Sequence, residues 1–114
     1  MTDMALSNLL NATQGYTIVT HCELIVHRPS WAMDLCLRLA ATETSGAPEV
    51  QVLFEGVSGL SLREFGGGLT QLLSLEAEDV SSEQLDRVKY RVRELERESL
   101  ALCCGGIRVD TLVA

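Results

Sequence analysis

Apolar and polar residues alternate in the stretch Trp31-Ala-Met-Asp-Leu-Cys-Leu-Arg-Leu39, and this alternation decides the fold. One face carries the apolar side chains of Trp31, Met33, Leu35, Leu37 and Leu39. The other face carries Asp34, Cys36 and Arg38. A period of two places one row of side chains in a core and the other toward water. We therefore predict a half-buried strand. Because only 4% of residues are aromatic, Trp31 is expected to anchor the core.

Segments on both sides continue the pattern of short strands. Residues 16–27 are rich in β-branched side chains, which favour strands, and Arg28-Pro29-Ser30 is expected to turn the chain. After a loop at residues 42–48, further strands are predicted at residues 49–57, 60–65, 69–79 and 107–113. Glycines mark the connections, at Gly56, Gly59, Gly66-Gly-Gly68 and Gly105-Gly106.

A short helix is predicted at residues 3–12, ahead of the strands. Leu6, Leu9 and Leu10 form a stripe with spacings of three and four. Thr2 or Asp3 can cap the start of the helix, and Gly15 is the expected helix breaker. The helix and strands together predict a single domain over residues 1–114, with the helix at 3–12 and the sheet at 16–113.

Two interpretations are open for residues 81–102. As a helix, the segment has apolar residues at spacings of three and four and a possible capping box of Ser81 and Gln84. As strands, Arg87-Val-Lys-Tyr-Arg-Val-Arg93 alternates basic and apolar residues, and a turn near residues 96–99 leads into Leu100-Ala-Leu-Cys-Cys104. Periodicity alone slightly favours the helix.

The charge of the chain excludes one class of partner and favours another. Sixteen acidic and nine basic residues give a net charge of −7. Nucleic-acid binding requires Lys and Arg to neutralise phosphates, so this balance argues against it. A basic protein partner is compatible with the charge, and so is the simpler interpretation that acidity keeps a small domain soluble.

The four cysteines and the N-terminus predict a cytoplasmic protein. There is no secretory signal and no apolar run of the roughly 20 residues that a membrane span needs. Reduced thiols are then expected at Cys22, Cys36, Cys103 and Cys104. Their spacing does not match a metal site, so neither a metal nor another cofactor is predicted.

His21 and Glu23 are the candidates for a small-molecule or catalytic pocket. They lie two residues apart, so they share one face of a strand, and a carboxylate beside an imidazole can transfer protons. Catalysis also needs a nucleophile or a second acid, and no motif supplies one. A structural contact between the two side chains is the alternative. Gly66-Gly-Gly68 lacks the Lys-Ser/Thr and the helix that a phosphate-binding loop requires.

An acid-rich stretch is the candidate partner-binding surface. Its residues are Glu76, Glu78, Asp79, Glu83 and Asp86. A basic row follows at once, at Arg87, Lys89, Arg91 and Arg93. The two rows can pair across a sheet, or the acids can be displayed to a basic partner.

Three segments together resemble a known class of small bacterial domain. They begin at Thr20-His-Cys-Glu-Leu-Ile25, at Val52-Leu-Phe-Glu-Gly-Val57 and at Tyr90-Arg-Val-Arg-Glu-Leu-Glu96. Their order resembles α+β domains of the immunity-protein type, which occur beside polymorphic toxins, and related domains of mobile elements. Such domains carry a His-Asp-x-Glu-like patch, of which Glu23 or His21 is matched here. The resemblance implies a strand hairpin at residues 87–104, which we adopt.

We therefore predict a mostly β member of the α+β class, with a short N-terminal helix and an antiparallel, meander-like twisted sheet of about six to eight strands. The favoured function is a non-catalytic protein-binding module, of the immunity type, that inhibits a partner toxin. The alternatives are a small enzyme or ligand-binding protein with a pocket at His21 and Glu23, and a homodimeric accessory protein joined through a sheet edge.

Overall fold

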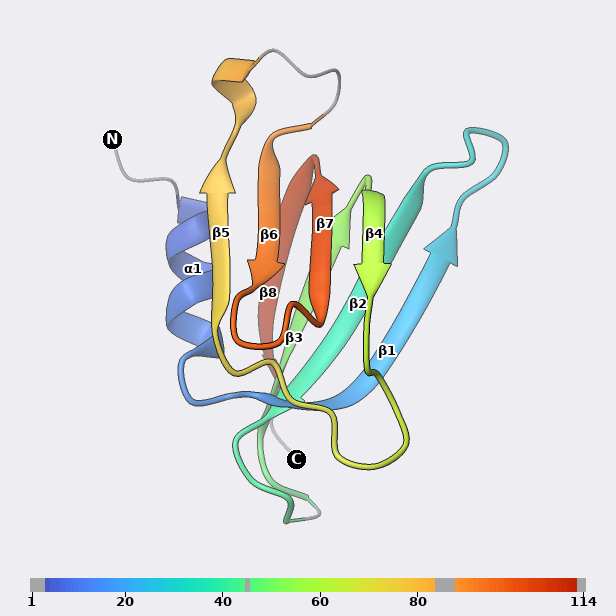
Figure 1. The fold of residues 1–114 in the computed structure, drawn as a ribbon. Helices are drawn as coiled ribbons and strands as arrows, with labels where there is room; N and C mark the ends of the chain where they lie inside the picture. Colours follow the sequence, from blue (N-terminus) through green and yellow to red (C-terminus); the bar gives the residue numbers. More distant parts are fainter. Residues whose placement is uncertain (1–3, 45, 84–87, 113–114) are drawn as a thin grey trace.

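The computed structural model describes residues 4–44, 46–83 and 88–112. One helix, one short 3-10 helix and eight strands follow one another along the chain (Figure 1). Their bounds are α1 Met4–Thr13, β1 Ile18–Val26, β2 Met33–Ala40, β3 Glu49–Glu55, β4 Ser58–Leu62, β5 Leu75–Asp79, η1 Ser81–Glu83, β6 Tyr90–Glu94, β7 Leu100–Cys104 and β8 Gly106–Leu112.

The strands form two antiparallel sheets of four, which confirms the predicted fold class and strand number. The first sheet has the order β1-β2-β3-β8 and the second has the order β4-β7-β6-β5. We predicted one meandering sheet. Two sheets form instead because the chain crosses between them twice at one corner, after β3 and after β7. Gly56, with φ of +65°, follows β3, and the Gly105 N–H donates to the Glu55 carbonyl at 2.8 Å. This bond joins the two crossings, so the sheets meet there.

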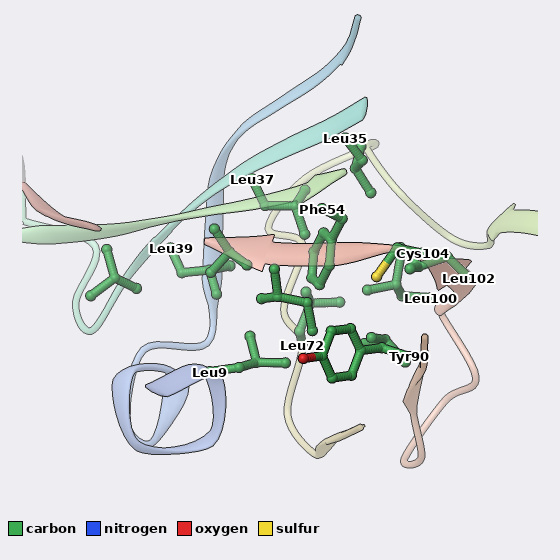
Figure 2. Packing of buried hydrophobic residues seen from close by; sticks show 14 residues of the cluster. Leu9, Leu35, Leu37, Leu39, Phe54, Leu72, Tyr90, Leu100, Leu102 and Cys104 are labelled. Carbon is green, nitrogen blue, oxygen red and sulfur yellow. The ribbon is translucent and has the colours of Figure 1, made fainter. Parts of the chain in front are cut away.

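The core lies between the two sheets, as Figure 2 shows. The alternation in β2 places Leu35, Leu37 and Leu39 inside, each no more than 1% exposed. Phe54 of β3 packs with them, against inward side chains of β6 and β7, Tyr90, Val92, Leu100, Leu102 and Cys104. Burial of each large apolar side chain contributes about 2 kcal/mol, so these rows hold the sheets together.

Helix α1 closes one side of the sandwich by packing against β8 and β5. It confirms the helix predicted at residues 3–12, whose possible caps Thr2 and Asp3 lie outside the described residues. Leu9 is fully buried, whereas Leu10 is 43% exposed, so the buried stripe is narrower than predicted. Gly15, with φ of +83°, ends the helical segment as expected.

Trp31 is not an anchor of the core, and that prediction is wrong. Strand β2 begins at Met33, and Trp31 lies in the preceding turn with φ of +62° and 65% exposure. The turn at residues 28–30 redirects the backbone, so the period of two does not extend back to Trp31. Cys36 does lie on the face opposite the core row, but it is only 7% exposed, because Glu23 and Leu53 flank it in the register.

Two other segments settle open questions of the sequence. The helical interpretation of residues 81–102 is wrong, since β6 and β7 form the hairpin that the resemblance implied; residues 84–87 lie outside the described part. The strand predicted over residues 69–79 is confirmed only from Leu75. Ahead of it, Gln71 forms an isolated bridge with Ile18, and Leu72 enters the core.

Candidate protein-binding surfaces

The first two residues of the acidic stretch, Glu76 and Glu78, lie on the outer face of the second sheet, where both are paired. Glu76 is opposite Arg93, at 3.6 Å, and Glu78 is opposite Arg91, at 3.0 Å. These four side chains are between 36% and 50% exposed. Partly exposed ion pairs across a sheet stabilise by a few tenths of a kcal/mol to about 1 kcal/mol. The predicted acidic and basic rows are thus brought together, as the pairing interpretation expected.

The remaining acids of the stretch contribute less to an open surface. The Asp79 carboxylate accepts hydrogen bonds from the Ser81 N–H, at 2.8 Å, and from the Ser81 hydroxyl. It therefore holds the start of η1. The side chain of Glu83 and all of Asp86 lie outside the described residues. The predicted binding role of the five acids stays a prediction.

A buried carboxylate, missed by the sequence prediction, organises the β6–β7 turn. Glu94 is 2% exposed and accepts hydrogen bonds from four backbone N–H groups and one hydroxyl. The donors are Ser74 N–H at 3.1 Å, Glu96 N–H at 3.1 Å, Arg97 N–H at 2.8 Å, Ser99 N–H at 3.4 Å and Ser99 Oγ at 3.3 Å.

These bonds decide the ionisation of Glu94. Burial by itself raises the pKa of this carboxyl, but the N–H donors of Arg97, Ser74, Glu96 and Ser99 outweigh it and hold the pKa below its ordinary value. The sequence did contain a signal for this residue. Glu94 continues the inward row of Tyr90 and Val92, and an acid on such a row requires dedicated partners.

A hollow of about 270 Å³ opens beside this turn on the outer face of the second sheet. Leu95, Leu100 and Ala101 line its apolar part, and Arg63 and Glu98, which are 3.5 Å apart, lie at its charged part. The hollow is shallow and mixed in character. It makes the charged face uneven, but its lining does not indicate a particular ligand.

His21 and Glu23 do contact each other, on the outer face of β1. His21 Nε2 lies 3.2 Å from Glu23 Oε1, and the side chains are 39% and 55% exposed. A hollow of about 450 Å³ is lined by the neighbouring residues Ile18, Val19 and Thr20, but not by His21 or Glu23. A pocket with the pair at its wall stays a prediction.

An apolar strip, also missed by the sequence prediction, runs along the inner face of β1. The register pairs Leu24 with Leu35 and Val26 with Met33, so these side chains share the face that points to the core. Leu24 and Val26 are nevertheless 48% and 49% exposed. In Figure 1, β1 lies at the outer edge of the first sheet, beside β4 and not behind it. The second sheet therefore leaves this part of β1 uncovered.

The turn between β1 and β2 carries Trp31 at the end of that strip. Its N–H donates to the His27 carbonyl at 2.7 Å, and the His27 N–H donates to the Ala32 carbonyl at 2.8 Å. The Arg28 guanidinium lies 5.3 Å from the centre of the Trp31 ring. Exposed Trp and Arg side chains in a fixed geometry are typical of residues that dominate protein interfaces.

Asp34 links this turn to the β3–β4 connection through hydrogen bonds. One carboxylate oxygen lies 2.7 Å from His27 Nε2, and the other accepts the Gly56 N–H at 3.0 Å. The Val57 N–H donates to the Met33 carbonyl at 2.7 Å. The hairpin tip is therefore braced against the β3–β4 connection, and its shape is set before any partner arrives.

The cysteines differ in burial, and Cys104 is fully buried. Cys22, Cys36, Cys103 and Cys104 are free thiols. Burial raises the pKa of Cys104 to about 12, so it stays protonated at neutral pH. Within residues 4–44, 46–83 and 88–112, no three His, Cys, Asp or Glu side chains are grouped to hold a metal. In the same residues, no helix is long and apolar enough to cross a membrane.

Comparison with known proteins identifies the family of the chain. Searches among curated proteins and among solved structures found no match. The family model described as "Immunity protein PIM8" matches residues 2–110, which include the helix and nearly all of the strands. This match confirms the resemblance seen in the sequence, and the chain belongs to the PIM8 family of immunity proteins.

Proposed function

We propose that the chain is an immunity-type inhibitor that binds and neutralises a partner toxin. The observation that carries the proposal is the family match over residues 2–110. Immunity proteins as a class protect by binding their toxins, so the relevant parts of the molecule are its surfaces. The cytoplasm is the proposed place of action, and the four free thiols support it.

The proposed action is steric and not catalytic. The candidate proton-transfer pair, His21 and Glu23, lies in open solvent on a strand face, where water screens both groups. The most buried thiol, Cys104, has a pKa of about 12 and is a poor nucleophile at neutral pH. Both observations favour a surface that covers the toxin.

The net charge of −7 supports a basic toxin as the partner. Opposite net charges accelerate the encounter of two proteins at low ionic strength. We assign the acid-rich stretch of residues 76–86 this steering role. Steering acts through the net charge before contact, so Glu76 and Glu78 need not leave their arginine partners or lose water for it.

Co-expression tests the proposed function. Where a toxin reading frame lies next to the gene of this chain, its toxin domain is produced in a bacterial host, with and without the chain. We expect growth to be restored by the wild-type chain and the two purified proteins to form a stable complex. Phe54→Asp, which buries a charge in the core, is the control that should fail. A folded wild-type chain that neither binds nor protects would contradict the proposal.

A further inference from the structure

We infer that the toxin docks on the β1–β2 hairpin, where an extended segment of the toxin adds to the free edge of β1 and apolar toxin side chains cover Leu24, Val26 and Trp31. The inference rests on the proposed function and names its surface. It places the short-range contact on the side of the molecule that carries β1, away from the acidic stretch of β5 (Figure 1).

The edge of β1 is open over most of its length. At its start, residues 70–72 occupy the outer side: the Val19 N–H donates to the Thr70 carbonyl at 2.9 Å, and the Leu72 N–H donates to the Thr17 carbonyl at 2.7 Å. Over residues 20–26, the described part of the chain provides only β2 as a hydrogen-bonded neighbour. One side of this segment therefore keeps its backbone groups available for another strand.

The other sheet edges are less suitable. Helix α1 packs against both β8 and β5, which form one edge of each sheet. The fourth edge, β4, is short, and its register shifts between Ser58 and Ser61. Irregular edges resist strand addition. The register of β1 also shifts, between Val19 and His21, but residues 21–26 pair regularly with β2. Among the described edge strands that α1 does not cover, β1 therefore offers the longest regular stretch.

The side chains along this edge of β1 also suit the addition of a strand. Leu24 and Val26 extend the inner apolar row, and Trp31 at the tip adds an aromatic ring that is 65% exposed. On the opposite face, Glu23 lies beside His21. A complementary strand would alternate, with apolar residues toward Leu24 and Val26 and a basic residue facing Glu23.

The backbone of Trp31 supports a binding role. A residue with a side chain at φ of +62° carries strain of about 1–3 kcal/mol, which a glycine would avoid. The ring returns little of this through packing, because it is largely in solvent. The hydrogen bonds among Trp31, His27 and Asp34 hold the strained shape. Such strain is typical of a side chain presented to a partner.

Self-pairing over the full length of the same edge is disfavoured, which favours a toxin segment over a second copy. The longest symmetric pairing of residues 20–26 places Glu23 opposite Glu23 of the other copy, and like charges there repel. Centring the pairing on Cys22 would set His21 against Glu23. That register, however, brings residues 25 and 26 of the copy onto positions already held by residues 70–72.

Matched variants test the inference. Leu24→Lys places a charge on the inferred contact, and Leu95→Lys places the same charge just after β6, next to the other sheet, at the same exposure of 48%. The affinity of each purified variant for the neighbouring toxin domain is measured by calorimetry. We expect Leu24→Lys and Trp31→Gly to weaken binding about 30-fold or more, and Leu95→Lys to change it less than threefold. Thermal melting confirms that each variant is folded.

The outcomes separate the inference from the proposed function. If the wild type binds and protects, and all three variants do so equally, the docking surface is wrong and the immunity function stands. If the wild type neither binds nor protects, the proposed function itself fails. A chain that sediments as a dimer, and becomes monomeric in Leu24→Lys, would show a second copy on this edge and overturn the toxin segment as its occupant.

Discussion

The two candidate surfaces of this immunity protein differ in whether other residues of the chain already pair with, or cover, their side chains. On the β5–β6 face, Glu76 and Glu78 each have an arginine across the sheet. On the β1–β2 hairpin, Leu24, Val26 and Trp31 are exposed without cover from the second sheet. Charges that are already paired gain little from a partner, whereas exposed apolar area gains free energy when it is buried.

We expect the two surfaces to have different kinetic roles. Charge acts at long range, so the acidic stretch should affect how fast the toxin arrives. Apolar anchors act at contact, so the hairpin should affect how long the toxin stays. Variants on each surface therefore test this division of roles.

The largest expected effect concerns Glu94, the buried carboxylate beside the charged face. Glu94→Ala leaves several buried N–H groups without an acceptor and should lower the free energy of unfolding by about 3 kcal/mol. Urea denaturation measures this change. Glu98→Ala, an exposed acid of the same turn, is the control and should cost less than about 0.5 kcal/mol. Equal losses would show that the turn does not depend on Glu94.

A dependence on pH should follow from the same carboxylate. The folded state lowers the pKa of Glu94, so its contribution to stability is fully present above the unfolded pKa, near pH 4.3 on the ordinary scale, and is lost as pH falls through the folded pKa. The stability difference between wild type and Glu94→Gln should therefore shrink as the pH is lowered from neutral through the acidic range. Urea midpoints across that range measure it. Parallel curves for the two proteins would contradict the lowered pKa.

A smaller effect is expected when the acidic row is neutralised. The double variant Glu76→Gln and Glu78→Gln leaves Arg91 and Arg93 without these partners and should slow association with a basic toxin about threefold at low salt. The dissociation rate should not change. Stopped-flow kinetics at two ionic strengths measures both rates.

Net charge is controlled with a second double variant, Glu43→Gln and Glu64→Gln, which alters the same number of charges on exposed loop residues. If both pairs slow association equally, the whole-chain charge steers the toxin and the acidic stretch has no special role. A changed dissociation rate for the Glu76→Gln and Glu78→Gln variant would instead show that the β5–β6 face lies within the interface. That result would contradict the separate kinetic roles of the two surfaces.

The sequence predicted well those features that depend on a local period. The row of Leu35, Leu37 and Leu39 is buried as the alternation required, and the helix ends at Gly15 as expected. The split into two sheets depends on the corner at Gly56 and Gly105, where residues distant in sequence meet. No local pattern records that meeting.

The candidate surfaces were harder to predict because exposure is a tertiary property. Leu24 and Val26 continue an inward row, and only the limited reach of the second sheet leaves them in solvent. The sequence shows an acidic and a basic row, but the pairing of Glu76 and Glu78 with Arg93 and Arg91 depends on the β5–β6 register. Glu94 was visible in the sequence as an acid on an apolar row, and its significance follows from that position.

The smallest expected change is in the stability of the Trp31 variants, and it distinguishes a presented ring from a structural one. Trp31→Gly removes backbone strain but increases the freedom of the unfolded chain, so the free energy of unfolding should stay within about 1 kcal/mol of wild type. Trp31→Ala keeps the strain without the ring and should be about 1 kcal/mol less stable than Trp31→Gly. Urea denaturation of the three proteins measures both differences. A loss of 3–5 kcal/mol, as for a packed aromatic, would show that the ring supports the fold and does not serve the partner.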